Sequence, residues 1–447
     1  MNIYFSGIEG MGIGPLAILA KKAGYGVFGS DEHESLMLNN QQAIGIDPHI
    51  GKQTDDYLQW VIDEHGVDWF VYTSALPDDH PELQLARRLD IKTSKRDELI
   101  NKIVADKRLK MIVVAGTHGK TTTVSMLIWT FLQLGIPIDF LNGTTTSFAP
   151  PADFNARAHY LVYEGDEFDR NFLQFRPYLA LIPAISYDHV DIFPSVEDYR
   201  MAFQQFIAQS EWTFSWQRDG LGGTVVEVDT GITLVGKQNR ENATLVKNAM
   251  LFLGTQDEAI GEKLGVRKPQ VDDNGMPIET MEDIMRAASS RLNDVLNEYT
   301  GSDRRFEKLA DNLYTDYAHH PNEIKATIEM AREITAKTGQ KLAVIYEPLQ
   351  NMRQHYIRHL YKDTFLGVDK LFWLPSYQLR EDPKYEILTP ETLIEEMDNK
   401  QIAEPAEANK ELFRKIDDLR KHNFLVLLLA GGSHADPILR KHYLEEA

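Results

Sequence analysis

Short apolar runs alternate with longer amphipathic stretches along this chain, and the alternation predicts strands followed by helices. Three times, a β-branched run meets glycine and then a helical pattern, first over residues 2–24 and again over residues 110–135. The last third holds further strand-like runs, at residues 313–318, 341–346, 370–375 and 424–432. Repeated strand–helix units of this kind are typical of parallel sheets covered by helices, so we predict an α/β fold.

The clearest chemical signal is the stretch VAGTHGKTTTVSM at residues 114–126. The helix after it keeps Val124, Leu127, Ile128 and Phe131 on one face, and Gly135 is a plausible stop. A glycine loop between strand and helix offers backbone N–H groups and a positive helix end to an anion. The interpretation is therefore a polyphosphate site, and the alternative is an ordinary tight turn with an exposed lysine.

A second glycine loop lies at the N-terminus, in GIEGMGIGPLA. Gly12, Gly14 and Ala17 give the spacing G-x-G-x-x-A, and Asp31 ends the next predicted strand, where a ribose-binding acid belongs. Glu9 is awkward there, because a carboxylate repels a pyrophosphate. A dinucleotide-type loop and a simple glycine-rich turn both remain open.

Acidic residues crowd the segment YEGDEFDRNF, directly after another predicted strand. Four carboxylates in six positions are costly to hold together unless a cation neutralises them. His189 follows a further strand, in ISYDHVD. A hard-ion site of Thr121, Glu164 and His189 is credible if these strand ends share one sheet edge, whereas a solvated loop and a structural histidine are the alternatives.

The C-terminal third supplies two more polar motifs, GSDRRFE and TDYAHHPNE. Arg304 and Arg305 could stabilise charge on a transferred phosphoryl group. Asp316, His319 and His320 end a predicted strand, where polar groups converge on a cleft. A surface arginine pair and a proline turn that caps a helix would explain the same residues.

The amino-acid composition excludes several functional classes for this protein. The 447 residues carry a formal net charge of −20, which argues against a nucleic-acid partner. Cysteine is absent, which excludes disulfides and thiolate metal sites and fits a cytoplasmic location. We see no signal peptide, and no apolar run reaches the roughly 20 residues of a membrane span, so we expect no membrane insertion.

Taken in order, the motifs resemble the Mur ligase family, ATP-dependent enzymes that add amino acids or peptides to UDP-N-acetylmuramic acid in peptidoglycan synthesis. The resemblance rests on the glycine loop with GSD, on GTHGKTTT, EGDEFD, DHVD, the asparagine-rich helix start, RRF and DYAHHPNE. It implies a Rossmann-like UDP-sugar domain over residues 1–104. A central P-loop ATPase-type domain over 105–300 and a Rossmann-like amino-acid domain over 301–447 would follow.

The family implies roles for the matching positions. Catalytic roles fall to Lys120, Glu164, His189, Arg305 and Asp316. Mg²⁺ would be held by Thr121, Glu164 and His189. ATP would be held by Gly116, Thr117, His118, Gly119, Lys120, Thr121, Thr122, Asn239, Asn242 and Arg305. The UDP-sugar and the incoming amino acid would be held by Gly10, Gly12, Asp31, Ser74, Tyr317, His319 and Arg353.

Within the family, GTHGKTT, RRFE and DYAHHPNE are most similar to the branch that joins L-alanine to the lactyl carboxylate of UDP-N-acetylmuramate through an acyl phosphate. YEPLQNMR at residues 346–353 departs from that branch, because Leu349, Gln350 and Met352 replace histidine, arginine and serine. The alternative is the recycling ligase that attaches a tripeptide. We expect a monomer or weak homodimer, and an exposed insertion over residues 254–280.

Overall fold

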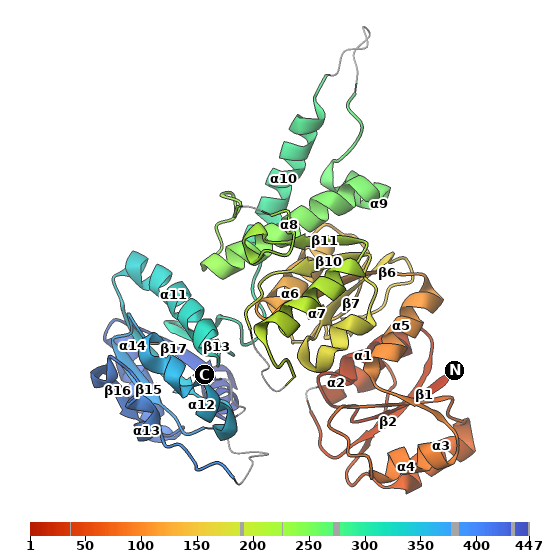
Figure 1. The fold of residues 1–447 in the computed structure, drawn as a ribbon, viewed down its shortest axis with the longest axis horizontal. Helices are drawn as coiled ribbons and strands as arrows, with labels where there is room; N and C mark the ends of the chain where they lie inside the picture. Colours follow the sequence, from red (N-terminus) through yellow and green to blue (C-terminus); the bar gives the residue numbers. More distant parts are fainter. Residues whose placement is uncertain are drawn as a thin grey trace. The chain divides into compact units, whose positions relative to one another are not determined.

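The computed structural model describes residues 1–35, 37–187, 192–225, 227–270, 278–376, 384–430 and 434–445 (Figure 1). The chain forms two compact units. Unit 1 comprises Met1–Ile232 with Glu241–Tyr299, and unit 2 comprises Thr233–Arg240 with Thr300–Ala447. Unit 1 holds two of the three large sheets and unit 2 holds the third, which confirms the α/β prediction. The domain boundaries at residues 104 and 300 stay predictions.

The N-terminal sheet has the order β3-β2-β1-β4-β5, and all its strand pairs are parallel. Its strands are β1 Asn2–Ser6, β2 Gly26–Asp31, β3 His49–Ile50, β4 Trp69–Tyr72 and β5 Lys92–Ser94. Its helices are α1 Gly14–Lys22, α2 Met37–Gln42, α3 Asp55–His65, α4 Pro81–Arg88 and α5 Arg96–Lys107. The strand ends of β2, β1 and β4 therefore lie next to one another at one edge, which is where ligands bind in open parallel sheets.

The central sheet has the order β11-β10-β6-β9-β7-β8 and is parallel except for the β7–β8 pair. Its strands are β6 Lys110–Ala115, β7 Asp139–Leu141, β8 Ala152–Asp153, β9 Tyr160–Gly165, β10 Leu179–Ile182 and β11 Trp212–Ser215. Its α-helices are α6 Lys120–Gln133, α7 Val196–Ala208, α8 Lys237–Gln256, α9 Glu258–Leu264 and α10 Met281–Asn297. Short 3-10 helices are η1 Phe168–Gln174 and η2 Gln217–Asp219.

The two sheets of unit 1 share one hydrophobic cluster. Ile3 and Phe5 of β1 and Met111 and Val113 of β6 belong to the same buried set, with α1 and α5 packed between them. Helix α1 contacts strands of both sheets, and α5 contacts β4 and β5 of the N-terminal sheet and the short helix η1 that follows β9. The N-terminal glycine loop is thereby positioned relative to the central sheet.

The predicted face of α6 is confirmed, since Val124, Leu127, Ile128 and Phe131 are all fully buried. Gly135, with a φ of 63°, follows the helix in the left-handed conformation that ends helices. The prediction of an exposed insertion over residues 254–280 is wrong in its first part. Residues 254–264 are mostly helical, in α8 and α9, and bury Ile260 and Leu264 because α9 carries its own apolar face.

Unit 2 is built on a sheet of order β12-β13-β17-β14-β15-β16, parallel except for β12–β13. Its strands are β12 Glu307–Ala310, β13 Leu313–Asp316, β14 Lys341–Glu347, β15 Lys370–Trp373, β16 Ala403–Pro405 and β17 Phe424–Ala430. Its helices are α11 Pro321–Thr338, α12 Asn351–Ile357, η3 Arg358–Asp363, α13 Pro390–Ile394, η4 Lys400–Ile402, α14 Lys410–Lys421, α15 Ala435–Arg440 and η5 Lys441–Glu445. Separate apolar clusters cover its two faces.

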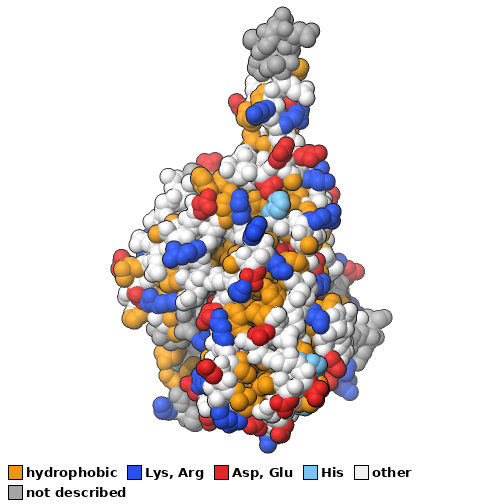
Figure 2. Space-filling model, turned by 90° about the vertical axis from the view of Figure 1, so that its right-hand side faces the viewer, with side chains coloured by type: hydrophobic (Ala, Val, Ile, Leu, Met, Phe, Trp, Pro, Cys, Tyr) orange, Lys and Arg blue, Asp and Glu red, His pale blue; other side chains and the backbone are white. Residues whose placement is uncertain are grey.

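Charge is dispersed where the surface can be inspected. On the face shown in Figure 2, described acidic and basic side chains are interspersed, with hydrophobic side chains gathered between them. Among the described helices, none is both long enough and apolar enough to cross a membrane.

Candidate active site

The loop between β6 and α6 has the backbone of an anion-binding turn. Gly116 and Gly119 have φ values of 156° and 81°, which disfavour residues with a side chain. A Cβ at Gly119 would lie 2.7 Å from Asn242 Oδ1, so the loop and the start of α8 approach closely. Thr117 is fixed by its backbone N–H, which donates to Ala184 O at 2.8 Å. The sequence therefore folds here as the phosphate interpretation requires, with N–H groups at a helix start.

The side chains of Thr117 and His118 also fix the loop to the segment after β10. Thr117 Oγ1 lies 2.6 Å from the Tyr199 hydroxyl and donates to Ser186 O at 2.7 Å. His118 Nε2 lies 2.8 Å from Ser186 Oγ. Hydrogen bonds of Thr117 and His118 therefore hold the loop against the segment after β10. The Thr122 side chain is half-buried on the first turn of α6.

Lys120, the first residue of α6, is held by an acid that the sequence analysis gave no role. Its Nζ donates to Gly116 O at 2.7 Å and to the two Glu167 oxygens at 2.9 and 2.7 Å. Burial alone would lower the pKa of Lys120, but the carboxylates of Glu167 and Glu164 outweigh it and raise that pKa. The lysine is therefore a fixed cation at the glycine loop.

The expected metal ligands are partly brought together. Thr121 Oγ1 donates to Glu164 Oε1 at 3.1 Å, so the helix start and the end of β9 meet as predicted. His189 lies outside the described residues, and within the described ranges no group of three metal-type ligands forms. Thr121 and Glu164 offer two oxygen donors of the kind that Mg²⁺ prefers.

The acidic segment after β9 is neutralised by side chains from elsewhere in unit 1. Glu167 pairs with Lys120, and Asp166 lies 3.5 Å from Arg96 of α5. Two of the four carboxylates are therefore paired with basic side chains of α6 and α5, while Glu164 contacts Thr121.

A cavity of about 250 Å³ links the N-terminal glycine loop to Glu164. Gly12, Glu164 and Arg96 all line it, and the Arg96 guanidinium lies 3.0 Å from where a Gly12 Cβ would be. Two further lining residues, Asn142 and Tyr163, each bury a polar atom with no hydrogen-bond partner among the described residues. Sequence reasoning missed these residues, because a lone arginine and a strand tyrosine carry no motif.

Asp31, which is predicted to hold the sugar nucleotide, also contacts the N-terminal glycine loop. Its carboxylate accepts the backbone N–H of Glu9 at 2.9 Å, so Asp31 fixes the glycine loop. Glu9 is buried and accepts both the N–H and the hydroxyl of Ser35 at 2.9 Å, so its charge faces the segment after β2. Gly10 donates its N–H to Gly7 O, and Ser74 is exposed in the turn after β4.

In unit 2, the segments GSDRRFE and TDYAHHPNE are joined by hydrogen bonds. Asp316 Oδ2 accepts the N–H of Phe306 at 2.7 Å, and Tyr317 N–H donates to Arg304 O at 2.8 Å. Arg304 and Phe306 have φ values of 58° and 49°, an uncommon conformation that these contacts hold. Burial raises the pKa of Asp316 to about 6. The Arg305 guanidinium lies over the Tyr317 ring at 5.5 Å.

The side chains of His319 and Arg353, both predicted to hold the incoming amino acid, lie next to each other. Arg353 Nη1 lies 3.2 Å from His319 Nε2, and burial lowers the pKa of His319, which favours the neutral imidazole that can accept from the guanidinium. His320, by contrast, caps α11 through Asn322 N–H. Asn239 donates to Val235 O and approaches Met330 Sδ, both within unit 2.

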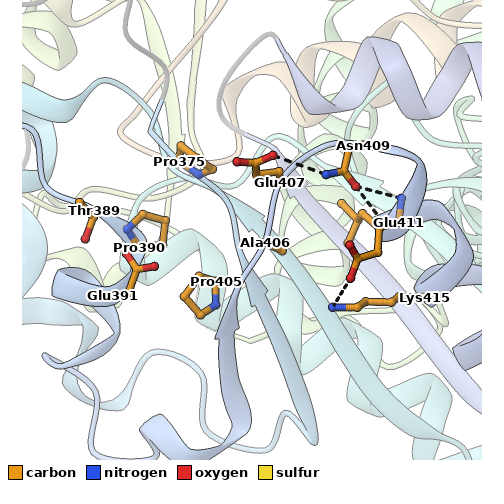
Figure 3. A pocket seen from close by; sticks show the side chains of 11 residues that line it. Pro375, Thr389, Pro390, Glu391, Pro405, Ala406, Glu407, Asn409, Glu411 and Lys415 are labelled. Atoms are coloured by element: carbon orange, nitrogen blue, oxygen red, sulfur yellow. Dashed lines mark hydrogen bonds and ion pairs between the residues drawn. The ribbon is translucent and has the colours of Figure 1, made fainter.

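A larger cavity, of about 480 Å³, lies beside the end of β16 in unit 2 (Figure 3). Two of its acidic side chains have partners, since Lys415 lies 3.5 Å from Glu411 and Asn409 donates to Glu407 at 3.5 Å. None of the residues predicted for the site lines this cavity. The larger volume of this cavity therefore does not identify it as the functional site.

Comparison with known proteins gives consistent matches over the chain. Three family models match: the Mur ligase family catalytic domain over residues 2–108, the Mur ligase middle domain over 114–215 and the Mur ligase glutamate ligase domain over 304–432. A UDP-N-acetylmuramate–L-alanine ligase of Fusobacterium nucleatum is 28% identical, over 96% of this chain and 94% of its own. One of Campylobacter jejuni is 29% identical, over 86% and 87%.

Solved structures show the same fold. A UDP-N-acetylmuramate–alanine ligase of Thermotoga maritima superposes with a TM-score of 0.71 at 20% identity, over 100% of this chain and 99% of that one. A murein peptide ligase of Psychrobacter arcticus gives a TM-score of 0.60 at 20% identity, over 99% and 98%.

Proposed function

The chain belongs to the Mur ligase family, and from this premise we propose that it joins L-alanine to the lactyl carboxylate of UDP-N-acetylmuramate at the expense of ATP. The reaction would serve peptidoglycan precursor synthesis. One observation carries the proposal: a single cavity reaches from Gly12 of the first glycine loop to Glu164, which contacts Thr121 beside Lys120. A sugar nucleotide and a triphosphate bound at these two loops would meet there.

The ATP phosphates are assigned to the second glycine loop. Backbone N–H groups of residues 116–121 would bind the phosphate oxygens, and Lys120 would offset their charge. Asn242, whose side-chain oxygen approaches Gly119, would contact the adenine. Thr121 and Glu164, with His189, would hold Mg²⁺, which polarises the transferred phosphoryl group when bound.

The sugar nucleotide is assigned to the first glycine loop and the cavity beyond it. Gly12 leaves room for the Arg96 guanidinium, a cation suited to a phosphate or a carboxylate. The buried donors of Asn142 and Tyr163 fit an acceptor-rich ligand, because such groups are costly when no partner is bound. Asp31 would act through the loop that it holds.

The acceptor amino acid is assigned to unit 2. Tyr317, His319 and Arg353 would frame its carboxylate and amine, and Arg353 supplies the positive charge. Arg305 and Asp316 would serve the γ-phosphate, as the family pattern implies.

The chemistry takes two steps. A lactyl carboxylate oxygen attacks the γ-phosphorus, the bond to ADP breaks, and an acyl phosphate forms. The acceptor amine then attacks the acyl carbon, loses a proton and expels inorganic phosphate. Lys120 and Arg305 offset negative charge in the first step, and exclusion of water protects the acyl phosphate.

A phosphate-release assay with UDP-N-acetylmuramate, ATP and Mg²⁺ tests the assignment. L-alanine, glycine, L-serine and L-alanyl-γ-D-glutamyl-meso-diaminopimelate are offered in parallel, and the amide product is identified by mass. We expect the highest kcat/KM with L-alanine. A preference for the tripeptide would instead establish the recycling activity, and release without an amide product would contradict both.

A further inference from the structure

A buried carboxylate lies directly beneath the first glycine loop. Glu82, the second residue of α4, has no solvent exposure. Its Oε1 accepts hydrogen bonds from the Tyr4 and Ser30 hydroxyls at 2.6 Å each, and its Oε2 accepts one from Ser6 Oγ at 2.6 Å. Gln53 Nε2 adds a longer contact at 3.4 Å.

All of these contacts are accepted by the carboxyl oxygens of Glu82. The distances of 2.6 Å between oxygens lie in the short part of the range for O–H···O hydrogen bonds, and hydrogen bonds to a carboxylate are stronger than those between neutral groups. Among the described residues, the partners recorded for the Glu82 carboxylate are hydroxyls and an amide, all neutral. Burial and the Glu82 charge both raise the pKa of Tyr4, so the phenol stays a donor.

The two serine partners of Glu82 lie where the first glycine loop begins. Ser6 ends β1 and pairs in register with Ser30 of β2. The N–H groups of Gly7 and Ile8 donate to Ser30 O at 2.9 and 3.1 Å, so the glycine loop starts from this pair. Asp31 follows Ser30 and accepts the N–H of Glu9. A shift of either serine therefore moves the loop.

We propose that Glu82 is a positioning residue for the sugar nucleotide: its carboxylate locks the ends of β1 and β2 together and so fixes the glycine loop that would receive the UDP group. The inference rests on the proposed function of that loop. Glu82 would not touch the ligand itself, because its side chain has no solvent exposure and four side chains contact its carboxylate.

Glu82→Gln is the main test, because glutamine keeps the shape and removes the charge. Loss of charge-assisted bonds at the base of the loop should raise the Kd for UDP-N-acetylmuramate, measured by calorimetry, by about tenfold or more. The KM for the sugar nucleotide should rise with it, while kcat and the Kd for ATP stay within about twofold. Ser30→Ala, which removes one hydroxyl, should act in the same direction and more weakly.

Tyr361→Phe is the matched control. Tyr361 is fully buried in unit 2, and its hydroxyl donates to Gln354 Oε1 at 2.5 Å. It should leave the Kd for the sugar nucleotide unchanged while lowering the melting temperature, as any buried hydrogen-bond loss does.

The outcomes separate this inference from the proposed function. Wild-type protein that binds no UDP-N-acetylmuramate refutes the proposed function. Wild-type binding with an equal Kd in folded Glu82→Gln or Ser30→Ala refutes the positioning role alone. A fall in kcat and in ATP affinity as large as that in sugar-nucleotide affinity would show a general structural role and would also overturn it. If Glu82→Gln fails to fold, Ser30→Ala decides.

Discussion

Lys120 should be needed for stability as well as for turnover, because its ammonium compensates a buried acid. The Glu167 side chain is 2% exposed and that of Lys120 15% exposed, with the charged atoms 2.7 to 2.9 Å apart. At an effective dielectric constant of about 20, the Coulomb attraction at this distance is roughly 6 kcal/mol before desolvation is subtracted. Lys120→Met removes it and leaves the carboxylate buried, which should cost about 3–5 kcal/mol of unfolding free energy.

The double variant Lys120→Met/Glu167→Gln separates the two roles. Removing both charges should restore most of the lost stability, so the two substitutions should be non-additive by about 2 kcal/mol or more. Neither protein should make amide product, because both lack the cation at the phosphate loop. Sugar-nucleotide binding should remain nearly intact in the double variant.

Urea unfolding followed by circular dichroism measures the stabilities, and phosphate release measures turnover. The reasoning is refuted if Lys120→Met loses less than about 1 kcal/mol, or if the double variant is no more stable than the single one. Normal turnover in either variant would refute the phosphate role.

Three further expectations follow from the site. Burial raises the pKa of Asp316 to about 6 against a usual 3.8, so the folded state holds a proton that the unfolded state releases, and stability should fall as pH rises through this window. Relative to Asp316→Asn, the wild type should lose about 2 kcal/mol between pH 4 and pH 7 in urea titrations, and parallel curves would contradict this. Glu164→Gln should raise the Mg²⁺ concentration for half-maximal rate about tenfold or more, and an unaltered Mg²⁺ requirement would remove Glu164 from the metal site. Arg353→Ala should raise the KM for the amino acid about tenfold or more and leave the KM for ATP unchanged, and an unaltered acceptor KM would remove Arg353 from the acceptor site.

The parts of the fold that sequence predicts best are those set by local pattern. The apolar face of α6 and the glycine turn before it follow from spacing alone, because helix periodicity and positive φ are local properties. The contact between Thr121 and Glu164 was also predictable, since Thr121 starts the helix after β6 and Glu164 lies near the end of β9, the neighbouring parallel strand.

The sequence does not predict which side chains pair when the two residues lie far apart along the chain. Lys120 and Glu167 are 47 residues apart, and Arg96 reaches Asp166 from another sheet's helix. The spacing predicts Asp31 as a ribose-binding acid, but it does not predict that the Asp31 carboxylate also accepts the backbone N–H of Glu9. In each of these contacts the sequence offers several acids as partners. The packing of α5 and of the glycine loop decides which acid forms the contact.

The most direct test of the central claim follows one oxygen atom. UDP-N-acetylmuramate labelled with ¹⁸O in both oxygens of its lactyl carboxylate is converted with ATP and L-alanine, and the released phosphate is analysed by mass spectrometry. Activation of the carboxylate by phosphoryl transfer predicts one ¹⁸O in each phosphate and one in the amide carbonyl. Phosphate that carries no label, with ATP consumed, would contradict the account.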